Sequence, residues 1–448
     1  MLTVDAALDR LTHSLAAAKR LGADSADAIY VGDGSTGIGV RMGVLEDIGR
    51  SEGEEVGLRV FVGQRSASVS SSDLSVDALQ EAVERAVAMA REAPEDAYAG
   101  LAPAELLMHE TPRDLDIDDG GEISAEKLKD MALAAEDAAR AVAGVTNSEG
   151  GSASSGRAVM ALATSTGFAR GYHGTSYGVS ASVIAGEGTG MHRDYAYHSS
   201  RFATDLETPE SIGLRAGTRA VRRLGPIKLD TQSLPVVFDP RVGGGMLSAL
   251  IGAITGSSIA RKTSFLLDAM GTQVFAPGIR IIDQPHRLRG LRSKPFDGEG
   301  LPTAERAIID DGVLTGWLME SASARQLGLT PTGHAARGVS GPPGAGTSNL
   351  HMAAGSTSRA DMIGSIKYGL YVTEMIGMGV NGLTGDYSRG ASGFLIENGE
   401  LTVPVAEVTI AGNLKDMFRA IVPADDLEFR YATNVPTLRI DGMTLAGA

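Results

Sequence analysis

The fold of this chain is decided by segments in which apolar and small polar residues alternate, and the clearest of them reads Tyr177-Gly178-Val179-Ser180-Ala181-Ser182-Val183. Alternation with a period of two places successive side chains on opposite faces of a strand, so it predicts a β-strand with one buried face. A second such run, Ala158-Val159-Met160-Ala161-Leu162, precedes it. Because several stretches between residues 157 and 201 repeat the pattern, we expect an antiparallel meander of strands joined as hairpins.

Two tight turns in the second half of the chain carry the signature of β-hairpins. Segments 308–314 and 395–401 each hold apolar residues on both sides of a turn pair, which is Asp311-Gly312 in the first and Asn398-Gly399 in the second. Asp-Gly and Asn-Gly supply the positive φ angles that a type I′ turn requires. Each segment therefore predicts two antiparallel strands joined by a two-residue turn.

Helical periodicity is concentrated in the first half of the chain. Residues 4–21 place apolar side chains on one helical face, and Gly22 can end that helix in a left-handed cap. Residues 28–70 change to short β-like runs broken by glycines, which suggests a glycine-punctuated sheet. Further helices are expected at residues 75–93, 124–142 and about 209–224.

The division into domains follows from the Gly225-Pro226 pair, which looks like a hinge between two halves. We place an N-terminal α/β-type half, with a glycine-rich antiparallel sheet and helices, at residues 1–225 and a β-rich C-terminal half at residues 226–448. The second half is expected to open with a strand at 235–238, followed by helical pieces around 247–254 and 265–267. The predicted fold class is therefore α+β.

Composition excludes several classes of protein. The chain has 448 residues, of which 43% are hydrophobic and 21% charged, a balance typical of globular domains. A net charge of −15 without a basic stripe argues against binding of nucleic acid. The absence of cysteine excludes disulfides, thiolate nucleophiles and Cys-ligated metals. Because we find neither a signal peptide nor an apolar tract long enough to span a membrane, we expect a cytoplasmic protein.

Motifs for nucleotide binding and for nucleophilic catalysis are better explained by local structure. Segments 32–37 and 377–382 match the glycine spacing of a dinucleotide fingerprint, but no helix is expected after either to receive a pyrophosphate. Segment 174–178 has the spacing of a nucleophile elbow around Ser176, yet a strand follows it. Ser124 opens a serine–lysine pattern, and its position before an apolar helix marks it as an N-cap.

Candidate metal ligands are few and scattered. The His109-Glu110 pair could begin a zinc helix, but Pro112 follows and no partner histidine lies nearby, so we assign the pair to a loop. His192 and His198 would share one face of a strand, although two imidazoles alone do not complete a site. The acidic pairs Asp118-Asp119 and Asp310-Asp311 are assigned to turns.

A resemblance to a known family is carried by a long C-terminal block. The block runs from Gly385-Asp386-Tyr387-Ser388-Arg389-Gly390 through Thr409-Ile410-Ala411-Gly412-Asn413-Leu414-Lys415-Asp416-Met417, and it closely resembles the TldD/PmbA family. Supporting matches are Arg261 to Asp268, Thr332-Gly333-His334 and Gly57-Leu58-Arg59-Val60. The resemblance covers essentially the whole chain and is specific to the PmbA branch, also called TldE.

This resemblance implies a pseudoenzyme. In the TldD branch a His-Glu-x-x-x-His helix and a later cysteine bind zinc, and the peptidase forms a heterodimer with TldE around a chamber where unfolded or leader peptides are cut. Alignment through the shared Gly252 puts Ser248, Ala249 and Ala253 at the three motif positions. None of them can ligate zinc or act as a general base. We therefore expect no catalytic residue and no metal ligand in this chain, with zinc held by the TldD-type partner.

Three hypotheses remain open from the sequence. In the first, the chain is a non-catalytic subunit that pairs with a TldD-type paralogue and admits a peptide, which open strand edges could bind by main-chain pairing. In the second, it is a self-sufficient metal-dependent peptidase that uses His192, Asp194 and His198. In the third, it is a homodimeric scaffold or peptide-binding module.

Overall fold

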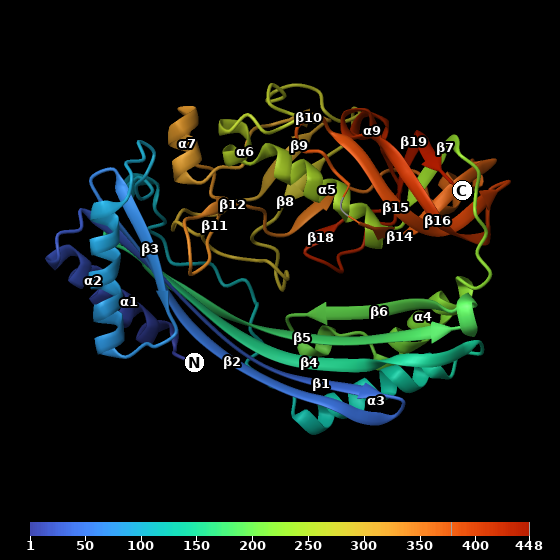
Figure 1. Ribbon diagram of the computed structural model, residues 1–448, viewed down its shortest axis with the longest axis horizontal. Helices are drawn as coiled ribbons and strands as arrows, with labels where there is room; N and C mark the ends of the chain where they lie inside the picture. Colours follow the sequence, from blue (N-terminus) through green and yellow to red (C-terminus); the bar gives the residue numbers. More distant parts are fainter. Residues whose placement is uncertain (378, 448) are drawn as a thin grey trace.

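The computed structural model describes residues 1–377 and 379–447, and it has the expected α+β architecture (Figure 1). The N-terminal half is built on one antiparallel sheet with the strand order β3-β2-β1-β4-β5-β6. This order confirms the predicted meander, because β4, β5 and β6 are consecutive neighbours in the sheet. The strands are β1 (Ser25–Arg41), β2 (Val44–Val62), β3 (Arg65–Ser71), β4 (Val145–Thr164), β5 (Ala169–Ala185) and β6 (His192–Ser200).

The strands between residues 25 and 62 are long, so the expectation of short runs broken by glycines was wrong at Gly32 and Gly34, whereas Gly43 and Gly63 do lie in turns between strands. β1 has 17 residues and β2 has 19, and they pair along their whole length. Glycines such as Gly34 and Gly37 remain in the ladder because both neighbours of β1 supply hydrogen-bond partners. The only register shift between β1 and β2 lies at Gly39/Val40. A continuous ladder therefore overrides the weak strand preference of glycine.

One face of this sheet is covered by four helices, which were all predicted from periodicity. Each begins with a serine or threonine whose side chain accepts a backbone N–H, and Ser124 is confirmed as one of these N-caps. The first two pack at one end of the sheet and the last two at the other. The helices are α1 (Val4–Arg20), α2 (Val76–Glu92), α3 (Ala125–Arg140) and α4 (Pro209–Arg222), with short 3-10 turns η1 (Ala104–Leu106), η2 (Gly188–Gly190) and η3 (Ala203–Asp205).

The C-terminal half is β-rich and contains a sheet with the order β16-β15-β14-β7-β19-β17. β16 also pairs with β19, so this sheet closes on itself around part of the main core. A second sheet has the order β10-β9-β8-β13-β18. The strands of this half are β7 (Gln232–Phe238), β8 (Ile281–Asp283), β9 (Arg306–Asp310), β10 (Val313–Leu314), β11 (Ala335–Ala336), β12 (Gly344–Ala345), β13 (Leu350–Met352), β14 (Tyr368–Ile376), β15 (Asp386–Glu397), β16 (Glu400–Asn413), β17 (Val422–Pro423), β18 (Thr433–Asn434) and β19 (Leu438–Ala446).

Both predicted hairpins are confirmed, whereas one predicted helix is absent. Asp311 and Asn398 have φ angles of 47° and 51°, and a glycine with positive φ follows each. The helical segment before this stretch ends at Ala260, and residues 265–267 form turns. Three apolar residues in a row fill the core there without helical backbone. The helices of this half are α5 (Pro240–Ile254), α6 (Gly256–Ala260), α7 (Ser321–Leu327), α8 (Arg359–Gly364) and α9 (Leu414–Ala420).

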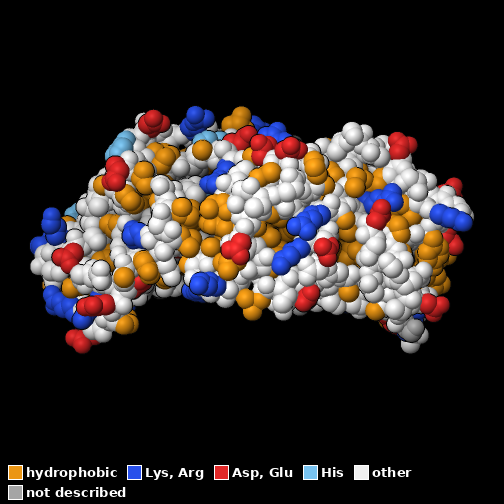
Figure 2. Space-filling model, turned by 90° about the horizontal axis from the view of Figure 1, so that it is seen from above, with side chains coloured by type: hydrophobic (Ala, Val, Ile, Leu, Met, Phe, Trp, Pro, Cys, Tyr) orange, Lys and Arg blue, Asp and Glu red, His pale blue; other side chains and the backbone are white. Residues whose placement is uncertain are grey.

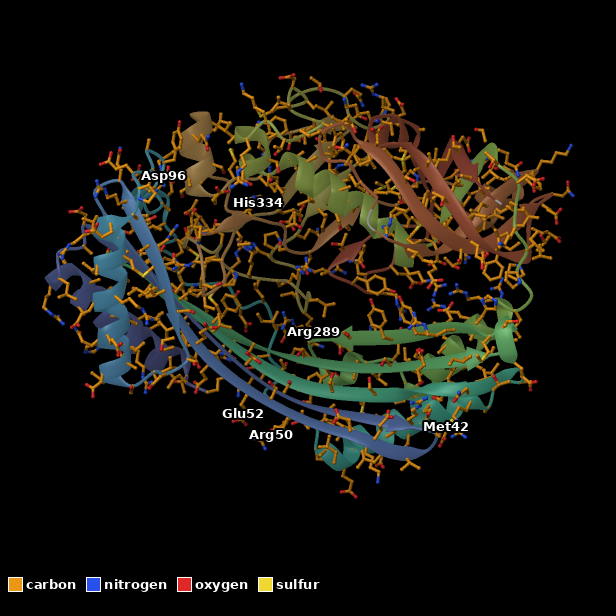
Figure 3. The ribbon with its side chains drawn as sticks, viewed as in Figure 1. Met42, Arg50, Glu52, Asp96, Arg289 and His334 are labelled. Atoms are coloured by element: carbon orange, nitrogen blue, oxygen red, sulfur yellow. The ribbon has the colours of Figure 1, made fainter. Side chains whose placement is uncertain are left out.

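The C-terminal half lies over the face of the N-terminal sheet that the helices leave free (Figure 1). At the end near α1 and α2, Ile29, Leu162 and Phe168 pack against Phe296 of the C-terminal half. Arg289 adds a polar tie, since its Nε lies 2.6 Å from Asp116 and its Nη1 3.1 Å from Asp205. Figure 3 shows Arg289 in this position, between the sheet and the upper half of the molecule. The two halves are thus joined by both apolar and ionic contacts.

The outer surface and the helices give two further observations. Acidic and basic side chains are interspersed over the face seen in Figure 2. Within residues 1–377 and 379–447, no helix is long and apolar enough to cross a membrane.

Candidate functional site

Much of the sheet face beneath the C-terminal half is open and carries almost only small side chains. Register pairs Ser180 with Ser152 on one side and with Tyr197 on the other, so these side chains share this face. Glycine in a strand interior allows close approach of another backbone. We call this surface the glycine–serine face, and it consists of Ser35, Gly37, Gly39, Ser152, Ser154, Gly156, Ser176, Gly178, Ser180, Ser182, Tyr195 and Tyr197.

A cavity of about 460 Å³ lies at the β6 side of this face, between the two halves of the chain. Tyr195 and Tyr197 line both this cavity and a neighbouring depression on the glycine–serine face. We call it the arginine–tyrosine cavity, and its lining is Tyr195, Tyr197, Arg215, Arg219, Asp239, Pro240, Arg241, Arg359, Asp426, Glu428, Arg430, Tyr431, Asn434 and Val435.

Two carboxylates hold three of the lining arginines, together with Arg223 beside the cavity. Asp194 accepts hydrogen bonds of 2.9 and 3.3 Å from Arg241 and lies 3.6 Å from Arg223. Glu207 in the same way pairs with both Arg215 and Arg430. Each carboxylate therefore serves two guanidinium groups, which come from different halves of the chain.

The other two arginines, Arg219 and Arg359, have no carboxylate within 4.0 Å among the described residues. Arg219 donates one hydrogen bond of 3.2 Å to the carbonyl of Tyr195. Arg359 donates one of 2.8 Å to the hydroxyl of Tyr371. Burial and then the nearby charge of Arg241 lower the pKa of Arg219, although Asp194 and Asp239 act in the opposite direction.

A tight turn before β18 presents part of the cavity wall. The side-chain oxygen of Asn434 accepts hydrogen bonds from the backbone N–H groups of Arg430 and Tyr431, at 2.9 and 2.8 Å. Its amide nitrogen donates to the carbonyl of Tyr431. This buried asparagine therefore fixes the turn so that Arg430 and Tyr431 face the cavity.

The three positions aligned with a zinc helix lie on α5 but do not share one face. Ser248 is exposed and its hydroxyl donates to the carbonyl of Gly244, whereas Ala249 is half-buried. Ala253 is only 5% exposed and packs into the main core. A separation of five residues turns by about 140° on a regular helix, which explains this divergence. Neither serine nor alanine fits a zinc ion, so no step of a metal-dependent reaction is derived from this helix.

His192, Asp194 and His198 lie on β6 as expected, but their surroundings differ from those of a metal site. Burial lowers the pKa of both histidines. His198 Nδ1 accepts the backbone N–H of Glu207, and Asp194 is held by arginines. Among the described residues there is no group of three or more His, Cys, Asp or Glu that could hold a metal ion.

The remaining motif segments have structural roles. Segments 32–37 and 174–178 lie inside β1 and β5, so neither precedes a helix. His109-Glu110 lies in a loop. Segment 377–382 includes residue 378, which is outside the described residues. Asp119 does more than form a turn, because it also accepts hydrogen bonds from the Tyr177 hydroxyl and the Ala203 N–H.

A second contact between the halves is a buried ion network that the sequence did not indicate. Asp27 lies on the sheet face below the C-terminal half, 2.5 Å from Arg59 and 2.6 Å from Arg337. Burial acts to raise the pKa of Asp27, but the two guanidinium groups outweigh it and hold that pKa below its usual value. Nearby, burial and then the neighbouring Asp297 raise the pKa of Glu299 to about 7.

This network also fixes the loop at residues 338–348. Arg337, directly before the loop, forms an ion pair with Asp27 of the network. The carbonyl of Val339 packs directly against Gly57. Near the other end Ser348 donates to Asp283. The loop is thus attached to both halves of the chain.

One signal for the arginine–tyrosine cavity was present in the sequence. Arg215, Arg219 and Arg223 recur at a spacing of four, which places the first two on one face of α4 and the third at its C-cap. The sequence predicted a helix at about residues 209–224 that carries these arginines. It did not show that residues from 426–435 would face the same arginines.

Comparison with known proteins gives consistent matches along the chain. Models of the PmbA/TldA metallopeptidase family match residues 26–90 (domain 1), 118–224 (central domain) and 231–447 (C-terminal domain). The metalloprotease PmbA of Escherichia coli O157:H7 is 41% identical over 99% of this chain and 98% of its own length. A PmbA homolog of Haemophilus influenzae is 38% identical over 92% of this chain and 89% of its own.

Solved structures show the same fold. A Bacteroides thetaiotaomicron protein described as a candidate modulator of DNA gyrase superposes with a TM-score of 0.92 and 27% identity, over all of both chains. TldE of Thermococcus kodakarensis superposes with a TM-score of 0.86 over 98% of this chain and all of its own, at 19% identity. The chain belongs to the PmbA/TldD metallopeptidase family, in its PmbA/TldE branch.

Proposed function

We propose that this member of the PmbA/TldD family is a non-catalytic subunit that pairs with a TldD-type zinc metallopeptidase and helps to enclose an extended peptide. The observation that carries the proposal is the surface of α5, where Ser248 is exposed, Ala249 is half-buried and Ala253 is buried. None of these side chains can ligate zinc or take a proton from water. The zinc and the general base then come from the partner.

A role in holding a peptide is supported by the glycine–serine face. Its side chains are short, so the backbone of an extended peptide can approach the sheet closely. Hydroxyl groups remain available to such a peptide, as with Ser154 and Ser176, both exposed. The face lies on the side of the sheet that is turned toward the C-terminal half (Figure 1), and a depression on it is lined by residues such as Ser152, Ser180 and Tyr195.

The two edges of the sheet differ in their ability to add a strand. The β6 edge is blunted, because Arg219 and Arg223 donate to the carbonyls of Tyr195 and Arg193. The β2 edge is open over residues 44–55, since β3 pairs only with residues 56–62. An unpaired edge is a template for another chain. We therefore assign main-chain pairing with a partner to β2.

The tip of the β1–β2 hairpin supports the same assignment. Met42, Val44, Leu45 and Ile48 are exposed by 47, 67, 37 and 59%, although they are large and apolar. Figure 3 shows Met42 at the end of the hairpin, far from the C-terminal half. Exposed apolar residues that cluster in this way are typical of protein contact surfaces.

The proposal is tested by hydrolysis of an unstructured peptide by this chain alone, by a TldD-type paralogue alone, and by the two mixed. We expect cleavage to be fastest in the mixture, by at least about tenfold, and to be abolished by a zinc chelator. Metal-dependent cleavage by this chain alone, lost on His192→Ala, would instead show a self-sufficient peptidase. No effect of this chain on the paralogue would favour a homodimeric scaffold.

The contact surface is tested separately. Ile48→Asp places a charge on the β2 edge, and we expect it to weaken association with the paralogue by about tenfold or more. Val76→Asp is the control, because Val76 is 84% exposed on α2, away from this edge. Size-exclusion chromatography with light scattering distinguishes the heterodimer from a pair of identical chains. The cytoplasmic location remains a prediction from the sequence.

A further inference from the structure

We propose that the arginine–tyrosine cavity binds a carboxylate of a peptide, either an acidic side chain or the C-terminal group. The ligand being a peptide rests on the proposed function, whereas the carboxylate rests on the cavity itself. The cavity opens beside the glycine–serine face, so a chain extended along that face can place one end among the arginines.

Two arginines of the cavity, Arg219 and Arg359, have hydrogen-bond donors that the protein leaves unused. A guanidinium group has five N–H donors in a planar fork. Arg219 uses one of them, on the Tyr195 carbonyl, and Arg359 uses one, on the Tyr371 hydroxyl. Neither is paired with a carboxylate of the described chain. Both therefore retain donors that a ligand oxygen could take.

The other arginines around the cavity are already paired with carboxylates. Asp194 and Glu207 each serve two guanidinium groups. Arg241 also has a buried Nε without a hydrogen-bond partner in the structure. Arg223, Arg241 and Arg430 also lie within 4.0 Å of Glu374, Asp239 and Glu428, respectively, so the preference for an anion comes from the unpaired Arg219 and Arg359. A carboxylate fits best, because its two oxygens match the guanidinium fork.

Three tyrosine rings form an aromatic wall of the cavity. The rings of Tyr195 and Tyr197 are stacked with centroids 6.2 Å apart, and Tyr431 lies 5.6 Å from Tyr197. Burial raises the pKa of Tyr197 to about 12, so its hydroxyl stays protonated and can donate at neutral pH. Tyrosine offers an apolar ring and a polar tip together. This wall suits the aliphatic and amide parts of a peptide next to its charged group.

The net charge of the chain would repel an acidic peptide, so binding of its carboxylate requires a local positively charged site. The chain's net charge is −15, so acidic peptides gain no general attraction to its surface. A preference for an acidic peptide must then arise locally. Within the structure, the arginine–tyrosine cavity brings together five arginines from both halves of the chain.

The test is calorimetric titration of the full chain, without a partner, with synthetic peptides of about ten residues. One peptide ends in Glu-Asp-Glu with a free carboxylate, and a second ends in Gln-Asn-Gln amide. Two mixed peptides carry either the acidic side chains or the free C-terminus, and so separate the two sources of carboxylate. We expect the fully acidic peptide to bind at least about tenfold more tightly than the neutral one.

The matched variant is Arg219→Ala with Arg359→Ala, which removes two guanidinium groups without leaving a carboxylate unpaired. We expect it to abolish the acidic preference while the neutral peptide binds as before. Arg359→Lys keeps the charge but loses the fork, so an intermediate preference is expected. Arg85→Ala, at an exposed position on α2, should change neither affinity.

Equal binding of the acidic and neutral peptides to the unaltered chain would overturn the proposal. So would an acidic preference that survives in the folded double variant, with folding checked by circular dichroism. Failure here is distinguishable from failure of the proposed function. Stimulation of a paralogue without acidic preference refutes only the carboxylate site, and acidic preference without stimulation refutes only the subunit role.

Discussion

Two of the ionic contacts between the halves of this molecule are built differently. In the contact around Asp27, one carboxylate is enclosed by Arg59 and Arg337, and their side chains are all less than 7% exposed. In the arginine–tyrosine cavity the groups are partly open to solvent, and Arg219 has no carboxylate partner among the described residues. We call the first the closed contact and the second the open contact.

The difference shows what buried and exposed charges can do at a domain boundary. A charge removed from water must be compensated within the protein, so the closed contact can hold the halves together but offers nothing to a ligand. A guanidinium that still meets solvent costs little to leave unpaired. The open contact therefore keeps binding capacity that the closed contact has used for attachment.

Substitution Asp27→Ala should have the largest effect. It leaves Arg59 and Arg337 buried without their shared carboxylate, and we expect the free energy of unfolding to fall by about 3–5 kcal/mol. Denaturant unfolding measures this loss. Asp47→Ala, on the exposed part of β2, is the control and should change stability by less than about 0.5 kcal/mol. A loss near that of the control would mean that the closed contact does not attach the halves.

Substitution Glu299→Gln should make the closed contact less sensitive to pH. The pKa of Glu299 is about 7 in the folded chain, so the folded state holds an extra proton between about pH 4.5 and pH 7. Stability from this group is therefore full at low pH and falls as the pH rises through that window. The variant should match the parent near pH 5 and exceed it by about 2–3 kcal/mol at pH 8.

The measurement is the unfolding free energy of parent and variant at several pH values. Glu305→Gln, at an exposed position, is the control and should leave the pH profile of the parent unchanged. A difference between parent and Glu299→Gln that stays constant from pH 5 to pH 8 would contradict the raised pKa.

Substitution Gly57→Ala tests the packing of the closed contact. An added Cβ would lie 2.1 Å from the carbonyl oxygen of Val339, so the loop must move away from the sheet. We expect a loss of about 1–3 kcal/mol in thermal or denaturant unfolding. Gly49→Ala on the same strand meets only the Asp47 side chain at 3.7 Å and should be neutral or slightly stabilising. Equal behaviour of the two variants would show that the loop is not tightly packed.

Substitution Arg219→Ala should have the smallest effect on stability. The side chain makes one hydrogen bond to the Tyr195 carbonyl and leaves no carboxylate behind, so we expect a change below about 1 kcal/mol. The same denaturant titration used for Asp27→Ala allows direct comparison. A loss above about 2 kcal/mol would erase the distinction, because the open contact would then be structural as well.

Much of the local structure could be predicted because its cause lies within a few neighbouring residues. The helices α1, α2, α3 and α4 follow from apolar residues at helical spacing and from N-caps such as Ser124. The two hairpins follow from Asp311 and Asn398, which adopt the positive φ that their turns require. The order β4-β5-β6 follows from alternation and short connections.

The errors have an equally physical origin. Glycines in β1 suggested breaks, but hydrogen bonds from both β2 and β4 keep the strand continuous. The apolar run at 265–267 suggested a helix, but the main core takes up these side chains from a turn. In both places, partners distant in the sequence decided what local preference alone could not.

The α+β class, the hairpins and the family resemblance could all be recognised without the structure, because periodicity, turn chemistry and motif spacing are properties of adjacent residues. Only the tertiary structure decided which charges meet. It brings Asp27 to Arg337, and α4 to the turn that carries Arg430, from widely separated parts of the chain. It also decided which arginine side chains remain exposed to solvent, since burial depends on every element packed around a side chain. The closed and open contacts therefore became visible only in the folded molecule.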